Sequence, residues 1–151
     1  MSDEIMVANE SALDVAAKNS VNFEIPTGYI CTVDISTLEG KLDVQNALNG
    51  ADSLSKRMNE TLILKNVVTT QGVRSVSGDV CTNTHLILAD GTTLFSQSDG
   101  VARSIATLVA LFTTVVNGVP VCDFGDGLPI KCIETKLRNG NTLKSIVAVR
   151  A

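Results

Sequence analysis

Residues 82–97 read TNTHLILADGTTLFSQ, two runs of apolar and β-branched residues joined by Asp90-Gly91. An Asp-Gly pair between two such runs is typical of a tight β-hairpin turn, because glycine adopts the positive φ that this turn requires without steric cost. We therefore expect strands over 82–88 and 92–97. The preceding residues 61–70, TLILKNVVTT, are also rich in β-branched side chains and predict another strand.

A helix is expected directly after this hairpin. Its apolar residues recur every three or four positions, as Val101, Ile105, Leu108, Phe112 and Val115. That spacing predicts one apolar stripe on an α-helix. Ser98 and Asp99 are suited to cap its start, and Asn117-Gly118 is expected to end it.

Two further regions complete the predicted order. Residues 130–137 and 142–149 are expected to form a second hairpin around Asn139-Gly140, after a loop over 119–129. Residues 37–58 predict a helix, with Gly50 as a stop and a short helical turn beyond it. The approximate helical repeat there is formed by Leu38, Leu42, Gln45, Ala47 and Leu48.

From residue 61 the expected order is strand, strand, strand, helix, strand, strand. This is the order of the OB-fold, a five-stranded barrel that binds oligonucleotides or oligosaccharides. The expected class is therefore mainly β (α+β): an OB-fold-like five-stranded barrel with a helix between strands 3 and 4, plus a helical or extended N-terminal segment. We expect an acidic arm over 1–35 and an OB-like domain over 36–151, together forming one compact domain.

The composition excludes several functional classes. The chain has 151 residues and is 44% apolar, which suffices for one domain with a core. Its net charge of −4 excludes a uniformly basic nucleic-acid binder, and 3% aromatic residues leave no rich stacking platform. The single histidine, His85, excludes a polyhistidine metal site. No apolar run reaches the roughly 18–20 residues that cross a bilayer, and the start lacks a secretory signal. We therefore expect an intracellular protein without a membrane partner.

Charge is distributed unevenly along the chain. Residues 1–52 hold nine acidic and two basic residues, whereas residues 53–151 hold seven acidic and ten basic residues. This excess of cations predicts an anion-binding face, and the alternative is a set of solvated surface charges. The candidate phosphate contacts are Lys65, Arg74, Lys131, Lys136, Arg138 and Lys144. Tyr29 and Phe95 are candidates for stacking on bases, with core packing as the alternative for Phe95.

Candidate catalytic groups are sparse. His85 lies in the middle of a predicted strand among apolar residues, which is typical of a structural histidine. Asp123, Asp126 and Glu134 could together bind a metal, but Asp123 to Asp126 also has the composition of an ordinary turn. The four cysteines have no zinc-site spacing and are expected in the core: Cys31, Cys81, Cys122 and Cys132. We expect no catalytic residue, no metal site and no cofactor.

Several short segments resemble the single-stranded DNA-binding proteins of phages and mobile elements of Gram-positive bacteria. These segments are QNALNGAD at 45–52, MNETLILKNV at 58–67, LILADG at 86–91, SDGV at 98–101, GLPIK at 127–131 and GNTL at 140–143. The resemblance extends over about residues 40–149. It implies a small OB-like protein that coats single-stranded DNA during phage or mobile-element replication in the bacterial cytoplasm.

The leading hypothesis is therefore sequence-tolerant, non-enzymatic binding of single-stranded DNA, with replication proteins and further copies of the chain as additional partners. A second hypothesis is a structural or assembly protein of a virion, which the low charge and many Thr, Val and Asn residues suit. A third is an enzyme with a metal held by Asp123 and Asp126.

Overall fold

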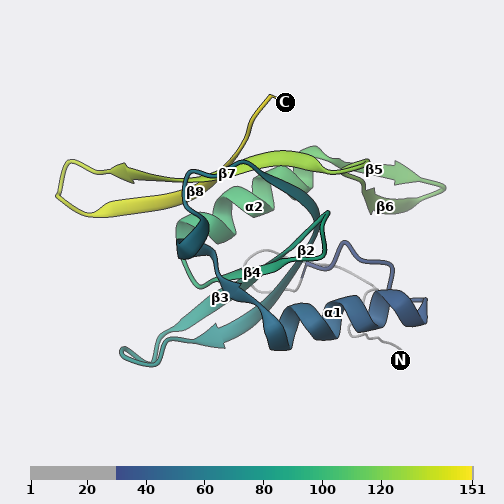
Figure 1. Ribbon diagram of the computed structural model, residues 1–151, viewed down its shortest axis with the longest axis horizontal. Helices are drawn as coiled ribbons and strands as arrows, with labels where there is room; N and C mark the ends of the chain where they lie inside the picture. Colours follow the sequence, from purple (N-terminus) through teal and green to yellow (C-terminus); the bar gives the residue numbers. More distant parts are fainter. Residues whose placement is uncertain (1–29, 151) are drawn as a thin grey trace. The chain divides into compact units, whose positions relative to one another are not determined.

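The computed structural model describes residues 30–150, and the compact unit considered below is Cys31–Ala151. Its main sheet has six strands in the order β1-β4-β3-β2-β7-β8. The strands of this sheet are β1 (Asp52–Ser53), β2 (Leu62–Val73), β3 (Val80–Leu88), β4 (Thr93–Ser96), β7 (Leu128–Lys136) and β8 (Thr142–Ala148). All neighbours are antiparallel except β1 and β4. The sheet curls into a half-barrel (Figure 1).

Strand β2 allows the sheet to curl because its first part and its remaining part pair with different strands. Its first residues, Leu62 to Leu64, pair with β7, and from Leu64 onward it pairs with β3. Leu64 pairs with Leu88 and Asn66 with Ile87, so Lys65 is an extra residue on β2. Such a β-bulge bends its strand and increases the local twist.

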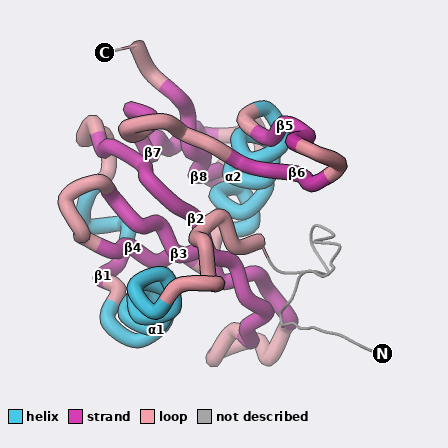
Figure 2. Tube along the Cα trace, turned by 90° about the vertical axis from the view of Figure 1, so that its right-hand side faces the viewer, coloured by secondary structure: helices cyan, strands magenta, loops and turns pink. Residues whose placement is uncertain are grey.

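The helices lie on different sides of this sheet. They are α1 (Leu38–Gly50), the short 3₁₀ helix η1 (Leu54–Arg57) and α2 (Asp99–Leu111). Helix α2 packs against β8 and β3, whereas α1 contacts β3 and β4 (Figures 1 and 2). The predicted OB-like α+β fold, with a helix between the third and fourth long strands, is therefore confirmed. The sheet differs from the expected five strands by the addition of the two-residue β1.

The core lies on the face of the sheet that α2 covers. Leu86 and Leu94 are paired across β3 and β4 and are each 1% exposed. Val101 and Ile105 of α2 are fully buried, as are Ile130 and Cys132 of β7. Of the four cysteines, Cys81 and Cys132 are buried and Cys31 and Cys122 are half-buried; all four are free.

The predicted helix over 101–115 is too long. Helix α2 ends at Leu111, and a separate hairpin follows, formed by β5 (Thr113–Val116) and β6 (Val119–Cys122). Asn117 and Gly118 both have positive φ, at 52° and 80°. They therefore form the tight turn of a hairpin rather than a helix stop. Val115, which continued the helical stripe, lies on β5 with 71% of its surface exposed.

The predicted helix over 37–58 also differs from the structure. Helix α1 ends at Gly50, and the expected further helical turn is the separate η1. Leu38 and Leu42 are 74% and 47% exposed, so the expected apolar stripe is not the buried face. Of the residues in that repeat, Ala47 is fully buried, in a small cluster with Val68 and Ile87. The small alanine allows α1 to approach the outer face of the sheet closely.

The remaining predicted strands and turns agree with the structure to within a few residues. Gly91 and Gly140 have φ of 90° and 87°, as the two predicted hairpin turns require. None of the helices within residues 30–150 has the length and hydrophobicity needed to cross a membrane. The division at residue 35 stays a prediction, because most of the N-terminal side lies outside the described residues.

Candidate nucleic-acid interface

The register of the β7–β8 hairpin separates the predicted cations onto two faces. Lys136 pairs with Thr142, and Lys144 pairs with Glu134 two positions further along. Because side chains alternate along a strand, Lys136 and Lys144 share the face that carries buried Ile146. Lys131 lies on the opposite face. The structure therefore brings Lys136 and Lys144 together and places Lys131 elsewhere.

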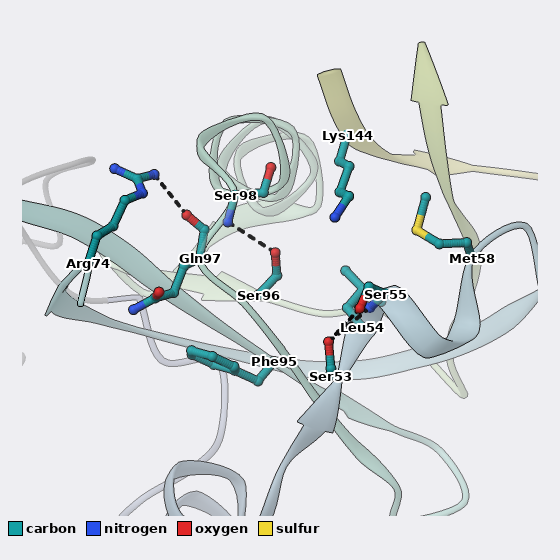
Figure 3. A pocket seen from close by; sticks show the side chains of 10 residues that line it. All are labelled: Ser53, Leu54, Ser55, Met58, Arg74, Phe95, Ser96, Gln97, Ser98 and Lys144. Carbon is teal, nitrogen blue, oxygen red and sulfur yellow. Dashed lines mark hydrogen bonds between the residues drawn. The ribbon is translucent and has the colours of Figure 1, made fainter. Parts of the chain in front are cut away.

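A pocket of about 330 Å³ opens between β8, η1 and the segment that joins β4 to α2, and we call it the cationic groove (Figure 3). It contains three of the predicted site residues, Arg74, Phe95 and Lys144. The remaining lining residues are Ser53, Leu54, Ser55, Met58, Ser96, Gln97 and Ser98. In Figure 3 the amine of Lys144 points toward Ser55 and Leu54, from the side opposite Phe95.

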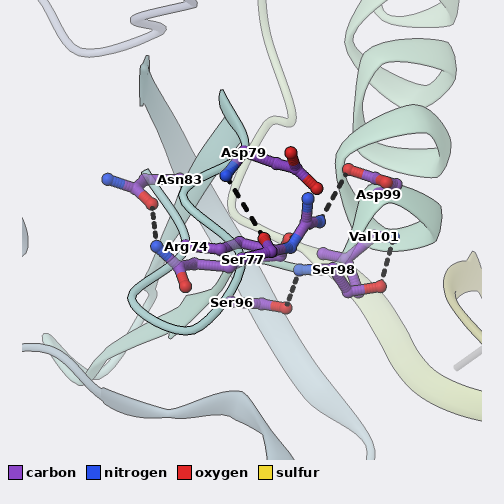
Figure 4. Close-up of polar contacts among 9 residues, drawn as sticks. Arg74, Ser77, Asp79, Asn83, Ser96, Ser98, Asp99 and Val101 are labelled. Carbon is purple, nitrogen blue, oxygen red and sulfur yellow. Dashed lines mark hydrogen bonds and ion pairs between the residues drawn. The ribbon is translucent and has the colours of Figure 1, made fainter. Parts of the chain in front are cut away.

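Arg74 is fixed at one end of the cationic groove. Its Nη2 donates to the Gln97 carbonyl at 3.1 Å (Figure 3) and to Asp99 Oδ1 at 3.0 Å (Figure 4). The hydrogen bond and charge of Asp99 raise the pKa of the Arg74 guanidinium. This contact joins the end of β2 to the start of α2. It also offsets part of the positive charge that Arg74 brings to the groove.

Phe95 lies on the outer face of β4, opposite His85 of β3. The two ring centroids are 5.1 Å apart and the rings are tilted by 40°. Phe95 is half-buried, so part of its ring is accessible. His85 is only 5% exposed, as expected of a structural histidine, and burial lowers its pKa. The buried His85 ring therefore packs against Phe95, while the exposed part of Phe95 faces solvent.

The other predicted site residues lie outside the cationic groove. Lys65 is the bulge residue of β2, and its Nζ donates to the Gly125 carbonyl at 2.5 Å. This bond ties β2 to the loop before β7. Arg138 is exposed beside the turn of the β7–β8 hairpin, beyond Lys136. Tyr29 lies outside the described residues.

Sequence reasoning missed the hydroxyl groups that line the cationic groove. Ser53 and Ser55 belong to the turn around η1, where Ser53 accepts a hydrogen bond from the Ser55 backbone N–H at 3.3 Å. Ser98 is the N-cap of α2 and accepts from the Val101 N–H at 3.3 Å. Local sequence predicts the cap at Ser98, but only the fold places it beside Lys144.

One of the carboxylates considered for a metal, Asp123, stabilises a turn of the backbone. Asp123 Oδ1 accepts a hydrogen bond from the Gly125 N–H at 2.7 Å, the geometry of a turn. Within residues 30–150, no group of three or more His, Cys, Asp and Glu side chains is arranged to hold a metal ion.

A comparison with protein families completes the description of this interface. The family model described as phage single-stranded DNA-binding protein matches residues 24–147. The chain belongs to this Phi29-type family of phage single-stranded DNA-binding proteins. No curated protein and no solved structure matches the chain significantly.

Membership of this family confirms the resemblance predicted from the sequence. The protein binds single-stranded DNA and acts in phage DNA replication. Proteins of this family are typically non-enzymatic. The match begins at residue 24, upstream of the segments that carried the resemblance. No feature of residues 30–150 favours the alternative of a virion assembly protein.

Proposed function

We propose that the DNA strand runs through the cationic groove and continues along the β7–β8 hairpin. Lys144 and Arg74 contact phosphates in the groove, and Lys136 and Arg138 contact the phosphates beyond it. The observation that carries this proposal is that Arg74, Phe95 and Lys144, from three separate parts of the sequence, line one pocket. Cations beside an accessible aromatic ring are the usual means of binding a single strand.

The spacing on the hairpin suits an extended backbone. Lys144 and Lys136 lie on one face and two register positions apart, which corresponds to roughly 7 Å along the strands. Glu134 is exposed on the same face, directly opposite Lys144, and reduces the local positive potential. Affinity is therefore modest, and it depends on several cations acting together rather than on one strong contact.

Most of this binding is independent of sequence, because phosphates are the same in every nucleotide. In this proposal stacking on Phe95 adds to the attraction without selecting a base, since every base has a π-face. The mechanism uses no cofactor and no catalytic group. We propose that the protein works in the host cytoplasm beside replication proteins and further copies of itself.

The test is the double variant Lys136→Glu with Lys144→Glu, titrated with a fluorescent oligo-dT. Reversing two cations on the proposed path should weaken binding at least roughly tenfold at low salt, since each phosphate contact contributes to the affinity. The matched control is Lys131→Glu, a lysine on the same hairpin but on the opposite face. Circular dichroism checks that both variants keep the fold. Equal losses in the double variant and in the control would contradict the proposed path.

A further inference from the structure

A second pocket adjoins the cationic groove on the other side of Phe95. Its volume is about 450 Å³, and we call it the side pocket. Its lining residues come from the end of α1, from the segment after it and from three strands: Leu48, Asn49, Ala51, Thr70, Asn83, His85 and Phe95. Phe95 lines both pockets. A DNA strand that lies in the cationic groove therefore passes beside the side pocket.

The lining of the side pocket matches the two surfaces of a nucleobase. Leu48, Ala51 and Phe95 provide apolar and aromatic walls for a flat ring. Asn83 and Thr70 provide polar groups at positions fixed by neighbouring strands, since Thr70 pairs with Asn83 across β2 and β3. Apolar walls with a few convergent polar groups are typical of pockets that bind small organic rings.

Asn83 is held in a defined orientation. Its Oδ1 accepts a hydrogen bond from Gln97 Nε2 at 3.0 Å. Its side chain lies over Gly72, where an added Cβ would come within 2.4 Å of Asn83 Oδ1. The Asn83 Nδ2 group has no partner among the described residues, so a positioned donor is available. The Asn83 side chain is labelled in Figure 4.

His85 also lines the side pocket. The residue is 5% exposed, and its buried Nδ1 has no hydrogen-bond partner among residues 30–150. Burial favours the neutral imidazole, and a hydrogen bond to the Ala47 backbone has the opposite, smaller effect on its pKa. The neutral His85 ring therefore adds an aromatic surface to the pocket wall beside Phe95.

We propose that the side pocket takes up one nucleobase of the bound strand and that Asn83 Nδ2 donates a hydrogen bond to an acceptor atom of that base. The inference rests on the proposed function, because the groove must first hold the strand. It goes further by adding a contact that depends on the identity of the base. Binding then has a small base preference on top of the electrostatic affinity.

The test compares two oligonucleotides of equal length, oligo-dT and an abasic strand that keeps the phosphates and sugars. Each is titrated against the wild type and Asn83→Ala at one salt concentration. We expect Asn83→Ala to weaken oligo-dT binding by roughly three- to tenfold, as for the loss of one hydrogen bond. Its affinity for the abasic strand should be unchanged. The matched control is Asn46→Ala, an exposed asparagine of α1 that does not line the pocket.

A second variant keeps the test informative if Asn83→Ala fails to fold. Asn83→Asp retains the volume and the acceptor for Gln97 but exchanges the free donor for an acceptor. An acidic side chain accepts from the cytosine amine, so the ratio of oligo-dT to oligo-dC affinity should fall. The NMR signal of His85, the only histidine of the chain, reports whether the pocket keeps its native structure in each variant.

The outcomes separate the two proposals. If the double variant Lys136→Glu with Lys144→Glu binds oligo-dT as tightly as the wild type, the proposed DNA path is wrong. If both strands bind but Asn83→Ala weakens them equally, or weakens neither, the side pocket holds no base. An unchanged ratio of oligo-dT to oligo-dC affinity in Asn83→Asp would also overturn the inference.

Discussion

Gly100 lies at the second position of α2, directly against the backbone of β8. An added Cβ at this position would be 2.0 Å from the Lys144 carbonyl oxygen and 2.7 Å from Leu143 Cδ1. Backbone cannot move aside as a flexible side chain can. The close approach of α2 to β8 therefore requires a residue without a side chain, and it also sets the position of Lys144 in the cationic groove.

We expect Gly100→Ala to lower the free energy of unfolding by about 1–3 kcal/mol, the usual cost of overpacking a tight contact. Urea denaturation measures it. The control is Gly50→Ala at the end of α1, where an added Cβ meets nothing within 4 Å. That control should be neutral or stabilising by up to about 1 kcal/mol, because alanine reduces the entropy of the unfolded chain. Similar results for the two variants would argue against the close approach.

His85 makes stability depend on pH. Burial lowers its pKa below the ordinary value of 6.5, so the unfolded chain binds a proton more readily than the folded chain. The free energy of unfolding should therefore be highest above pH 6.5 and fall as the pH drops through this value. Urea denaturation between about pH 7.5 and 5.5 measures the slope, and His85→Gln should reduce it. An unchanged slope in His85→Gln would assign the effect to other groups.

At the scale of elements, one hydroxyl joins α2 to β8. Ser104 Oγ donates to the Gly100 carbonyl at 2.8 Å and accepts from the Ile146 N–H, also at 2.8 Å. Ile146 is 3% exposed, so water has little access to its N–H. The helix therefore provides the hydrogen-bond acceptor for this buried backbone N–H.

Ser104→Ala should lower the free energy of unfolding by about 1–3 kcal/mol, because it leaves the buried Ile146 N–H unsatisfied. Thermal and urea unfolding measure this loss. Thr107→Ala is the control on the same helix, since the exposed Thr107 hydroxyl bonds to the Arg103 carbonyl within that helix. Ser104→Ala should cost clearly more than Thr107→Ala. Equal costs would mean that the serine does not bridge helix and strand.

The predicted length of α2 was wrong, and the cause also lies in neighbouring elements. Val115 continued the helical spacing, so the periodicity extended the helix through it. Yet TTVV at 113–116 is β-branched, and Asn117-Gly118 is a hairpin turn. The local sequence therefore indicated the β5–β6 hairpin, but the same Asn-Gly pair is also typical of the end of a helix. The structure resolves this ambiguity through the positive φ of both residues.

For the whole molecule, the arrangement of cations matters more than their sum. The net charge is −4, yet the proposed path brings together four cations: Arg74, Lys136, Arg138 and Lys144. Each phosphate contact releases counterions, so the affinity should fall as salt rises. With four contacts, the plot of log affinity against log salt should have a slope on the order of −3.

Replacing Lys136 and Lys144 by Gln should reduce the steepness of that slope by roughly 1.4, since about 0.7 is lost for each contact to a single strand. Anisotropy titrations with oligo-dT at several salt concentrations measure both slopes. Lys131→Gln, on the other face, should leave the slope unchanged. A slope near zero for the wild type would contradict an interface based on phosphate contacts.

Most residues of the proposed interface could be predicted from the sequence, but their arrangement in space could not. Arg74, Phe95 and Lys144 were all candidates, and the fold places them in one groove. Lys131 was an equally good candidate by type and position, but the register of β7 and β8 puts it on the other face. Alternation along β7 separates Lys131 from Lys136, but the pairing with β8 decides which of them shares a face with Lys144. Asn83 gave no signal at all, because an isolated asparagine in a strand is common.

The sequence by itself determined the order of the long strands, the position of α2 and the turns at Asp90-Gly91 and Asn139-Gly140. These features depend on contacts between near neighbours, and on the backbone freedom of glycine. Only the tertiary structure decided the bulge at Lys65, the pairing of β2 with β7 and the face of each cation. These depend on pairings between residues far apart in the chain, and a shift of one residue in register would exchange the two faces of a strand.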